Sequence, residues 1–79
     1  MNIKVLFFGA TADSAGKREI SFVIRDDLQA RKALSSIVEK YPVLSRHKLL
    51  FAINQEYARG DEILSDGDEL AIFTAVSGG

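Results

Sequence analysis

The last four residues of the chain, Val76-Ser77-Gly78-Gly79, could carry chemistry at their end. Glycine has no side-chain atoms, so Gly78-Gly79 could pass through a narrow channel and adopt torsions that other residues avoid. An extended four-residue segment reaches roughly 13–14 Å, at about 3.3–3.6 Å per residue. The group delivered at that distance would be the α-carboxylate of Gly79. An ordinary terminus or an engineered addition could end in the same residues, so the rest of the sequence must distinguish these interpretations.

A carboxylate is a poor electrophile until one of its oxygens is converted to a leaving group, as in an acyl-adenylate made from ATP. The glycines of "GATADSAG" at residues 9–16 lack the adjoining Gly-Lys-Ser/Thr sequence of a phosphate-binding loop. We therefore predict that a separate adenylating enzyme uses ATP and Mg to activate Gly79. The chain itself is expected to bind no cofactor.

Length and composition predict one small domain over residues 1–75, followed by an extended tail over residues 76–79. The 79 residues are 47% hydrophobic and 27% charged, which is typical of a globular domain with a modest core. A formal net charge of -1 gives no basic footprint for nucleic acid, and no apolar run is long enough to span a membrane. The absence of cysteine fits a cytoplasmic protein. We therefore expect neither a nucleic-acid partner nor a membrane.

Apolar periodicity and turn residues divide the chain into short elements. A short helical turn is expected at Ala10–Gly16, and an amphipathic helix is expected from an Asp26-Asp27 N-cap to Tyr41, where Pro42 ends it. Asn54–Ala58 predicts a tight turn with a short returning edge strand. The main strands are expected at Ile3–Phe8, Glu19–Ile24, Leu49–Asn54 and Glu69–Ala75.

The order of these elements predicts an α+β, ubiquitin-like β-grasp fold. The first and last strands are both strongly apolar, and a right-handed crossover lets them lie parallel and adjacent in the middle of a mixed sheet. One main helix then packs across one face of that sheet. The flexible C-terminal Gly-Gly tail would leave directly from a central strand.

The sheet face away from the helix is expected to carry an exposed apolar patch. Side chains alternate along a strand, so Lys4 assigns Leu6 and Phe8 to the solvent side. The last strand sends Phe73 to the same side, and Tyr57 extends the group. A loop that covers Phe8 or Phe73 is the alternative. Because a contiguous exposed apolar patch usually marks a binding surface, we predict that these four apolar residues bind a protein partner.

Two other groups of polar residues lack the ligand pattern of a metal site. Asp66-Gly67-Asp68 lies in an acidic stretch without the ligand series of a calcium loop, so a solvated turn is expected there. His47 is the only histidine, and no predicted acid or nucleophile motif surrounds it. We therefore interpret His47 as a surface residue and predict no metal site.

Four segments together resemble the small subunit of molybdopterin synthase, a ubiquitin-like sulfur carrier. The resemblance covers essentially the whole chain. Its most specific part is the last segment, with the Asp-Gly-Asp-Glu turn, apolar strand and Val-Ser/Thr-Gly-Gly end of that family. The segments are "IKVLFF" at residues 3–8, "AGKREI" at 15–20, "AINQEYA" at 52–58 and "LSDGDELAIFTAVSGG" at 64–79.

The resemblance implies a carrier that is non-catalytic alone and transports sulfur on its carboxyl terminus. Gly79 would be adenylated by an activating enzyme, converted to a thiocarboxylate with sulfur from a donor protein, and inserted into the large synthase subunit. There the sulfur would pass to cyclic pyranopterin monophosphate in molybdenum cofactor biosynthesis. Val76, Ser77 and Gly78 would thread the channel, the apolar patch would contact the partner, and two copies of each subunit would form a heterotetramer.

Two positions depart from the pattern of that family. Thr74-Ala75 stands where the family often has Pro-Pro, which gives a tail that is less stiff. Ala12-Asp13 stands where the family often has an Arg-Glu pair, so any partner contact made by that arginine is missing here. Neither departure touches the terminal carboxylate.

Three other functions stay open from the sequence. A sulfur carrier for thiamine or another sulfurated metabolite would share the tail and its activation. A ubiquitin-like protein modifier would instead place Gly79 in an isopeptide bond to lysine. A β-grasp binding module would have an inert tail, so deleting Gly79 would leave its activity unchanged. The recipient, whether a pterin, a thiazole precursor or a protein lysine, distinguishes the first two from the molybdopterin carrier.

Overall fold

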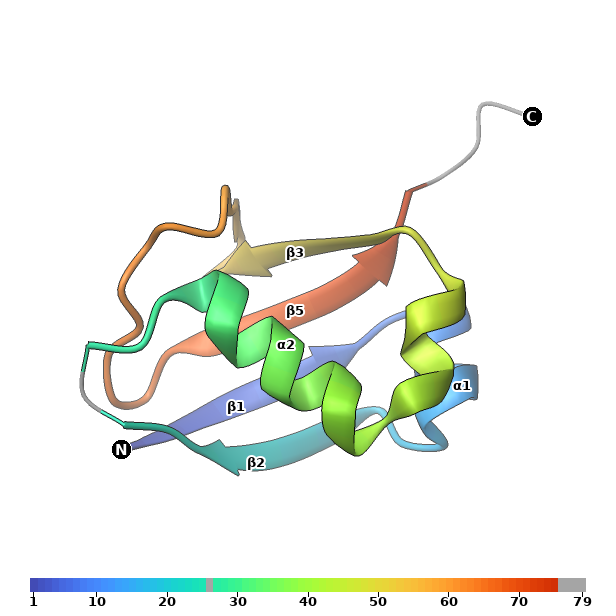
Figure 1. Cartoon of the computed structure of the whole chain (residues 1–79), viewed down its shortest axis with the longest axis horizontal. Helices are drawn as coiled ribbons and strands as arrows, with labels where there is room; N and C mark the ends of the chain where they lie inside the picture. Colours follow the sequence, from blue (N-terminus) through green and yellow to red (C-terminus); the bar gives the residue numbers. More distant parts are fainter. Residues whose placement is uncertain (26, 76–79) are drawn as a thin grey trace.

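The computed structural model of the chain describes residues 1–25 and 27–75. Within them, five strands form one mixed sheet in the order β2-β1-β5-β3-β4, and helix α2 crosses one face of it (Figure 1). The β-grasp arrangement expected from the sequence is confirmed, and each of the four main strands ends one residue earlier than expected. The elements are β1 (Asn2–Phe7), α1 (Ala10–Ala15), β2 (Glu19–Val23), α2 (Ala30–Lys40), the 3-10 helix η1 (Pro42–Arg46), β3 (Leu49–Ile53), β4 (Glu56–Tyr57) and β5 (Glu69–Thr74).

The two central strands, β1 and β5, pair in parallel, with Phe7 beside Ile72. A parallel pairing requires a crossover, and the connection between these strands passes through α2. β5 also pairs antiparallel with β3 as far as Thr74. The strand that leads to the C-terminal tail therefore has a hydrogen-bonded neighbour on each side.

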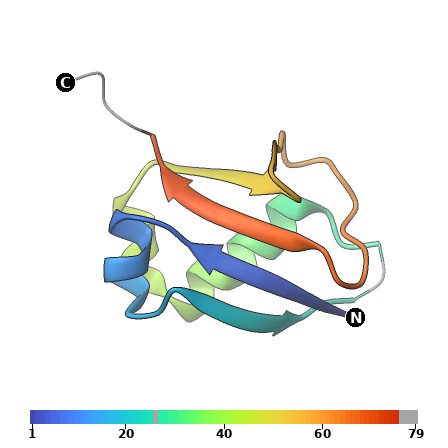
Figure 2. The same ribbon diagram turned by 180° about the vertical axis from the view of Figure 1, so that it is seen from behind.

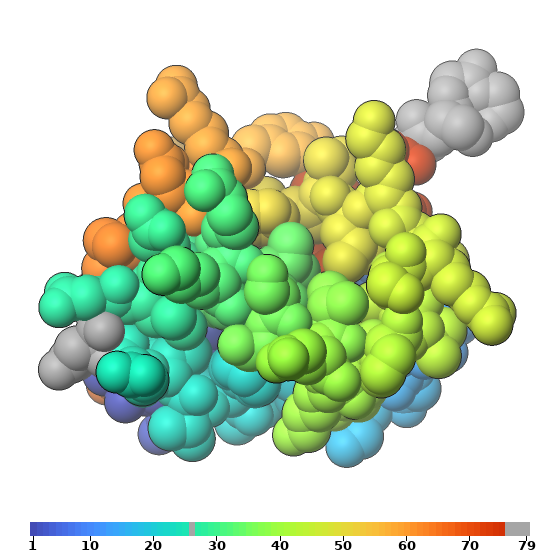
Figure 3. Space-filling view, in the orientation of Figure 1, coloured from blue at the N-terminus to red at the C-terminus, as the bar shows by residue number. Residues whose placement is uncertain are grey.

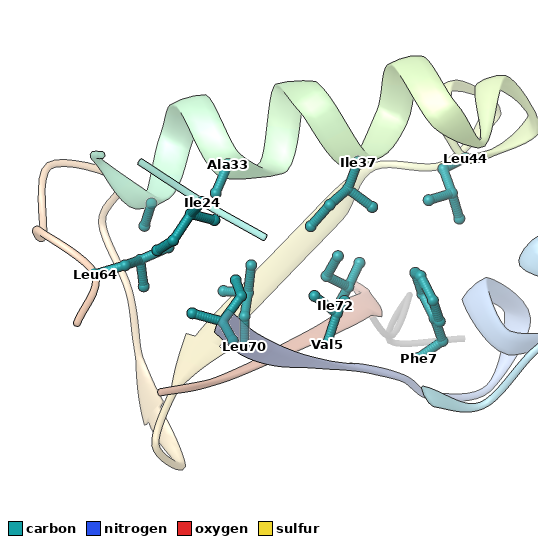
Figure 4. Close-up of a cluster of buried hydrophobic side chains, with 11 residues drawn as sticks. Val5, Phe7, Ile24, Ala33, Ile37, Leu44, Leu64, Leu70 and Ile72 are labelled. Atoms are coloured by element: carbon teal, nitrogen blue, oxygen red, sulfur yellow. The ribbon is translucent and has the colours of Figure 1, made fainter. Parts of the chain in front are cut away.

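The core lies between α2 and the helix-covered face of the sheet, as the close-up shows (Figure 4). Val5 and Phe7 of β1 point toward Ile37 of α2, and Leu44 of η1 lies beside them. Burying a side chain of this size stabilises the fold by about 1.5–3 kcal/mol. In the space-filling view, side chains of α2 and η1 form the surface over this core (Figure 3). The buried hydrophobic residues are Ile3, Val5, Phe7, Ile24, Ala30, Ala33, Ile37, Leu44, Leu64, Leu70 and Ile72.

Helix α2 begins later than the sequence predicted, and the Asp26-Asp27 N-cap is wrong. The residue at the N-cap position makes no side-chain cap hydrogen bond. Carbonyl groups of a distant loop accept the first N–H groups of the helix instead. The Ala30 N–H donates to the Glu62 carbonyl at 2.8 Å, and the Arg31 N–H donates to the Gly60 carbonyl at 2.9 Å. Tertiary hydrogen bonds therefore set the start of this helix.

Helix α2 ends at Lys40, in agreement with the stop expected from Pro42. The chain then turns directly into η1, which begins at Pro42 and buries Leu44; the sequence pattern did not indicate this element. Among the helices of the described residues, none has both the length and the apolar character needed to cross a membrane.

The turn between β3 and β4 holds two non-glycine residues in the left-handed region, with a φ of 49° at Asn54 and 71° at Gln55. Asparagine tolerates this conformation, whereas glutamine adopts it at a cost. We predict that Gln55→Gly raises the free energy of unfolding by about 0.5–1 kcal/mol, measured by urea denaturation. Gln55→Ala removes the side chain but keeps the Cβ, so it should give no gain. Equal midpoints for the glycine variant and the wild type would contradict the prediction.

Candidate functional site

The predicted reacting segment, Val76–Gly79, lies outside the described residues, so the structure locates only the point from which it leaves the fold. β5 ends at Thr74, and the following Ala75 N–H donates to the Lys48 carbonyl at 3.3 Å. Helices α1 and η1 lie at the same end of the sheet (Figure 1). The tail therefore starts from a strand that is hydrogen-bonded to its neighbours.

Figure 2 shows the sheet face away from α2, to which the sequence assigned the predicted partner-binding residues. Leu6 of β1 and Phe73 of β5 both have buried neighbours in their strands, so their side chains point to this open face. The ring of Tyr57 packs against the ring of Phe73, with centroids 5.8 Å apart. Phe8 is 50% exposed, and its N–H donates to the Ile72 carbonyl at 3.1 Å, beside the end of β5. Tyr57 and Phe73 are therefore in contact, and Phe8 lies beside the end of β5.

Sequence reasoning missed one residue of this surface. Leu50 of β3 is the register partner of Phe73 and is 36% exposed. The two-residue period of a strand could have indicated it, because Leu49 and Phe51 on either side pack against the core and Leu50 must point the other way. We name the following residues the open-face patch: Leu6, Phe8, Leu50, Tyr57 and Phe73.

The open face becomes polar away from the tail. Lys4 of β1 lies between Glu69 of β5 and Ser21 of β2 in the strand register. Opposite charges on adjacent strands attract one another, although the energy of an exposed pair is small. The open-face patch thus has a charged boundary on one side. Such a boundary would favour one orientation of a docked protein.

A cavity of about 530 Å³ adjoins the open-face patch at the end of β1. Leu6 and Phe8 line its apolar side, while Arg18 and Glu19 line its charged side. Ala12-Asp13 of α1 complete the wall, at the place where the resembled family often has Arg-Glu. Because Ala12 ends in a single methyl group, its side chain leaves most of this space unfilled.

His47 is not the isolated surface residue that the sequence predicted. Its Nε2 lies 2.7 Å from Ser14 Oγ, in a partly buried hydrogen bond. The bond joins α1 to the segment between η1 and β3. A hydroxyl and an imidazole at this distance resemble a nucleophile and its base. Here the bond joins two packed segments of the fold, so its role is structural. It holds α1 beside the start of β3.

The acidic stretch before β5 forms a turn, as predicted, and its carboxylates accept backbone hydrogen bonds. The Glu62 carboxylate accepts the N–H groups of Arg59 and Gly60, each at 2.8 Å. Asp68 accepts the Ser65 N–H at 2.7 Å. In residues 1–25 and 27–75, no three His, Cys, Asp or Glu side chains are grouped to hold a metal ion. These carboxylates therefore fix the shape of the loop.

We predict that Glu62 makes the free energy of unfolding depend on pH. Hydrogen bonds from the Arg59 and Gly60 N–H groups hold the pKa of Glu62 below its ordinary value. The stabilisation is therefore complete above the ordinary pKa of about 4.3 and is lost as the pH falls through the lowered native value. Glu62→Gln should flatten the acid limb of a plot of denaturation midpoint against pH. Glu39→Gln, at an exposed position of α2, should not, and an unchanged Glu62→Gln profile would contradict the prediction.

Comparison with known proteins identifies the family of the chain. The sequence pattern of the ThiS family matches residues 5–79. The chain belongs to the ThiS family. A curated relative of this ThiS-family chain is the "Molybdopterin synthase sulfur carrier subunit" of Chlamydomonas reinhardtii, which is 40% identical over 83 aligned positions covering 100% of both chains. The family resemblance carried by the four sequence segments is confirmed.

Solved structures have the same fold as this ThiS-family chain. SAMP1 from Haloferax volcanii has a TM-score of 0.89 and 30% identity, and the match covers 100% of both chains. A chain in the complex of subunits 1 and 2 of molybdopterin-converting factor from Helicobacter pylori has a TM-score of 0.72 and 23% identity, again over 100% of both chains. The second likeness is one of fold alone. Both agree with the β-grasp fold of the ThiS-family chain.

Proposed function

We propose that this ThiS-family chain is the sulfur carrier subunit of molybdopterin synthase. The full-length match at 40% identity to a protein of that name carries the proposal. On this proposal, Gly79 is adenylated, converted to a thiocarboxylate, and donates its sulfur to cyclic pyranopterin monophosphate in molybdenum cofactor biosynthesis. The open-face patch supports the proposal, because two of its residues, Phe8 and Phe73, lie beside the end of β5, from which the tail departs.

The chain and its partners divide the work. The Gly79 carboxylate attacks the α-phosphorus of ATP on an activating enzyme, which binds the ATP and Mg and releases pyrophosphate. Sulfide-level sulfur from a donor protein then attacks the acyl carbon of the adenylate, which forms the C–S bond of the thiocarboxylate and releases AMP and a proton. The carrier binds no cofactor of its own and supplies a reactive end on a segment about 13–14 Å long. The hydrogen-bonded β5 fixes the origin of that segment, so docking of the patch would determine where the sulfur arrives.

The proposed main partner is a large synthase subunit, in a heterotetramer with two copies of each chain in the cytoplasm. The name of the fold neighbour from Helicobacter pylori, a complex of subunits 1 and 2, supports a two-subunit assembly. Val76, Ser77 and Gly78 would enter the active site of the large subunit, and the open-face patch would remain outside it as the docking surface. No nucleic-acid or membrane contact is part of the proposal.

A ubiquitin-like protein modifier is the second candidate. The full-length likeness to SAMP1, whose name in a further structure is small archaeal modifier protein 1, favours it. The same activated Gly79 acyl group would then pass to a lysine amine, with loss of AMP and a proton. The two functions therefore share activation and differ in the recipient.

The intact mass of the chain tests both candidates. The chain is incubated with a cognate activating enzyme, ATP and a sulfur donor, and a known carrier is treated in parallel as a control for enzyme activity. The expected result is replacement of one terminal oxygen by sulfur. Conjugates to protein lysines without a thiocarboxylate would support the modifier. An unchanged mass, with the control carrier converted, would overturn the sulfur carrier proposal.

A further inference from the structure

Thr11 is the only buried polar residue in the described part of the chain, with 0% of its surface exposed. It lies in the first turn of α1. Its Oγ1 accepts the Phe8 N–H at 3.0 Å and lies 2.7 Å from the Phe8 carbonyl and 2.9 Å from the Ile72 carbonyl. The single hydroxyl proton is shared between those two carbonyls. One side chain thus links the end of β1, helix α1 and strand β5.

Besides the Thr11 hydroxyl, backbone hydrogen bonds hold Phe8, whose N–H also donates to the Ile72 carbonyl at 3.1 Å, but the residue after it is free to move. Gly9 follows Phe8 with a φ of 57° and a ψ of -128°, and glycine reaches many other conformations at low cost. The core does not require a hydroxyl here either. Valine has nearly the shape of threonine and buries no polar group. The hydroxyl of Thr11 therefore contributes placement of its hydrogen-bond partners more than burial.

We infer that Thr11 is a positioning residue for partner docking: its hydroxyl sets where Phe8 of the open-face patch lies relative to the end of β5. The inference rests on the proposed function, in which the patch docks on the large synthase subunit. A methyl carbon approaches a carbonyl oxygen no closer than about 3.3 Å, so in Thr11→Val the new methyl group and each of the Phe8 and Ile72 carbonyl oxygens must lie about half an ångström farther apart than the hydroxyl allows. The displaced backbone carries the Phe8 ring with it.

Separate measurements of docking and of sulfur transfer test this role of Thr11. The thiocarboxylated chain is mixed with increasing large subunit, and single-turnover sulfur transfer is followed. Thr11→Val should raise the half-saturating concentration about ten-fold and leave the rate at saturation within about two-fold of wild type. Thr11→Ser keeps the hydroxyl and should restore wild-type docking. NMR spectra of the free chain should show the largest amide shifts at Phe8 and Ile72 in the valine variant.

A stability-matched control separates positioning from general destabilisation. Ile37→Val loosens the core under α2, on the face of the sheet opposite the patch, and should leave the half-saturating concentration unchanged. If Thr11→Val docks like wild type, Thr11 has no positioning role. The same conclusion follows if Ile37→Val weakens docking as much as Thr11→Val does. If the folded wild-type chain itself fails to bind the large subunit, the proposed function is overturned, and the docking role of Thr11 falls with it.

Discussion

Deleting Gly79 should reduce sulfur transfer at least about a thousand-fold while leaving the fold and the docking of the chain intact. The deletion moves the terminal carboxylate back by about 3.3–3.6 Å, the reach of one residue. A misplacement of about 1 Å can already cost about a hundred-fold in rate, because the reacting atoms must be within contact distance and aligned. A carboxylate that stops one residue short would reach neither the activating enzyme's ATP nor the bound pterin precursor.

Two measurements locate this loss in the chemistry of the tail. The denaturation midpoint should not change, because β5 ends at Thr74 and its pairing does not include Gly79. Calorimetry with the large subunit should show an affinity close to wild type if the open-face patch supplies most of the docking energy. Gly79→Ala is the matched control, since it keeps the reach and adds one methyl group, and it should retain more transfer than the deletion. Transfer by the deletion variant within ten-fold of wild type would indicate an inert tail.

The fold and the open face of the sheet could be predicted because each depends on a local pattern. Alternation in β1 and β5 distinguished the core face from the open face, and Leu6 and Phe73 lie where that pattern placed them. Leu50 was within reach of the same rule, because successive side chains of any strand point to opposite faces of the sheet. These predictions needed only the two-residue period of a strand and one charged residue, Lys4, to identify the solvent side.

The remaining features depend on contacts between segments that are far apart in the sequence. The start of α2 is set by the Glu62 carbonyl, which a local N-cap rule cannot reveal. The Ser14–His47 hydrogen bond joins α1 to the middle of the chain, and the Thr11–Ile72 hydrogen bond joins it to the last strand. Serine and threonine in a short helix are common, so their residue types gave no signal. Only the packing of α1 on the sheet shows which hydroxyls have partners.

Replacing Phe8 by alanine should weaken binding to the large subunit about 30- to 1,000-fold, the range of a hot-spot truncation of about 2–4 kcal/mol. An aromatic side chain buries about 150–250 Å² in an interface, and Phe8 is half exposed in the free chain and so available for that burial. Val43→Ala is the matched control, because Val43 is 45% exposed but lies on η1, on the α2 side of the sheet. Its affinity should stay within about two-fold of wild type.

The rate of sulfur transfer at saturating large subunit then distinguishes a docking role of Phe8 from a role in the transfer step. At saturating large subunit, Phe8→Ala should transfer sulfur at the wild-type rate, because β5 and Gly79 are unchanged and the alanine removes only docking energy. Excess partner should therefore rescue Phe8→Ala and should not rescue the Gly79 deletion. If excess large subunit fails to rescue Phe8→Ala, Phe8 also positions the tail during transfer. If Val43→Ala loses as much affinity as Phe8→Ala, the docking surface is not the open face of the sheet.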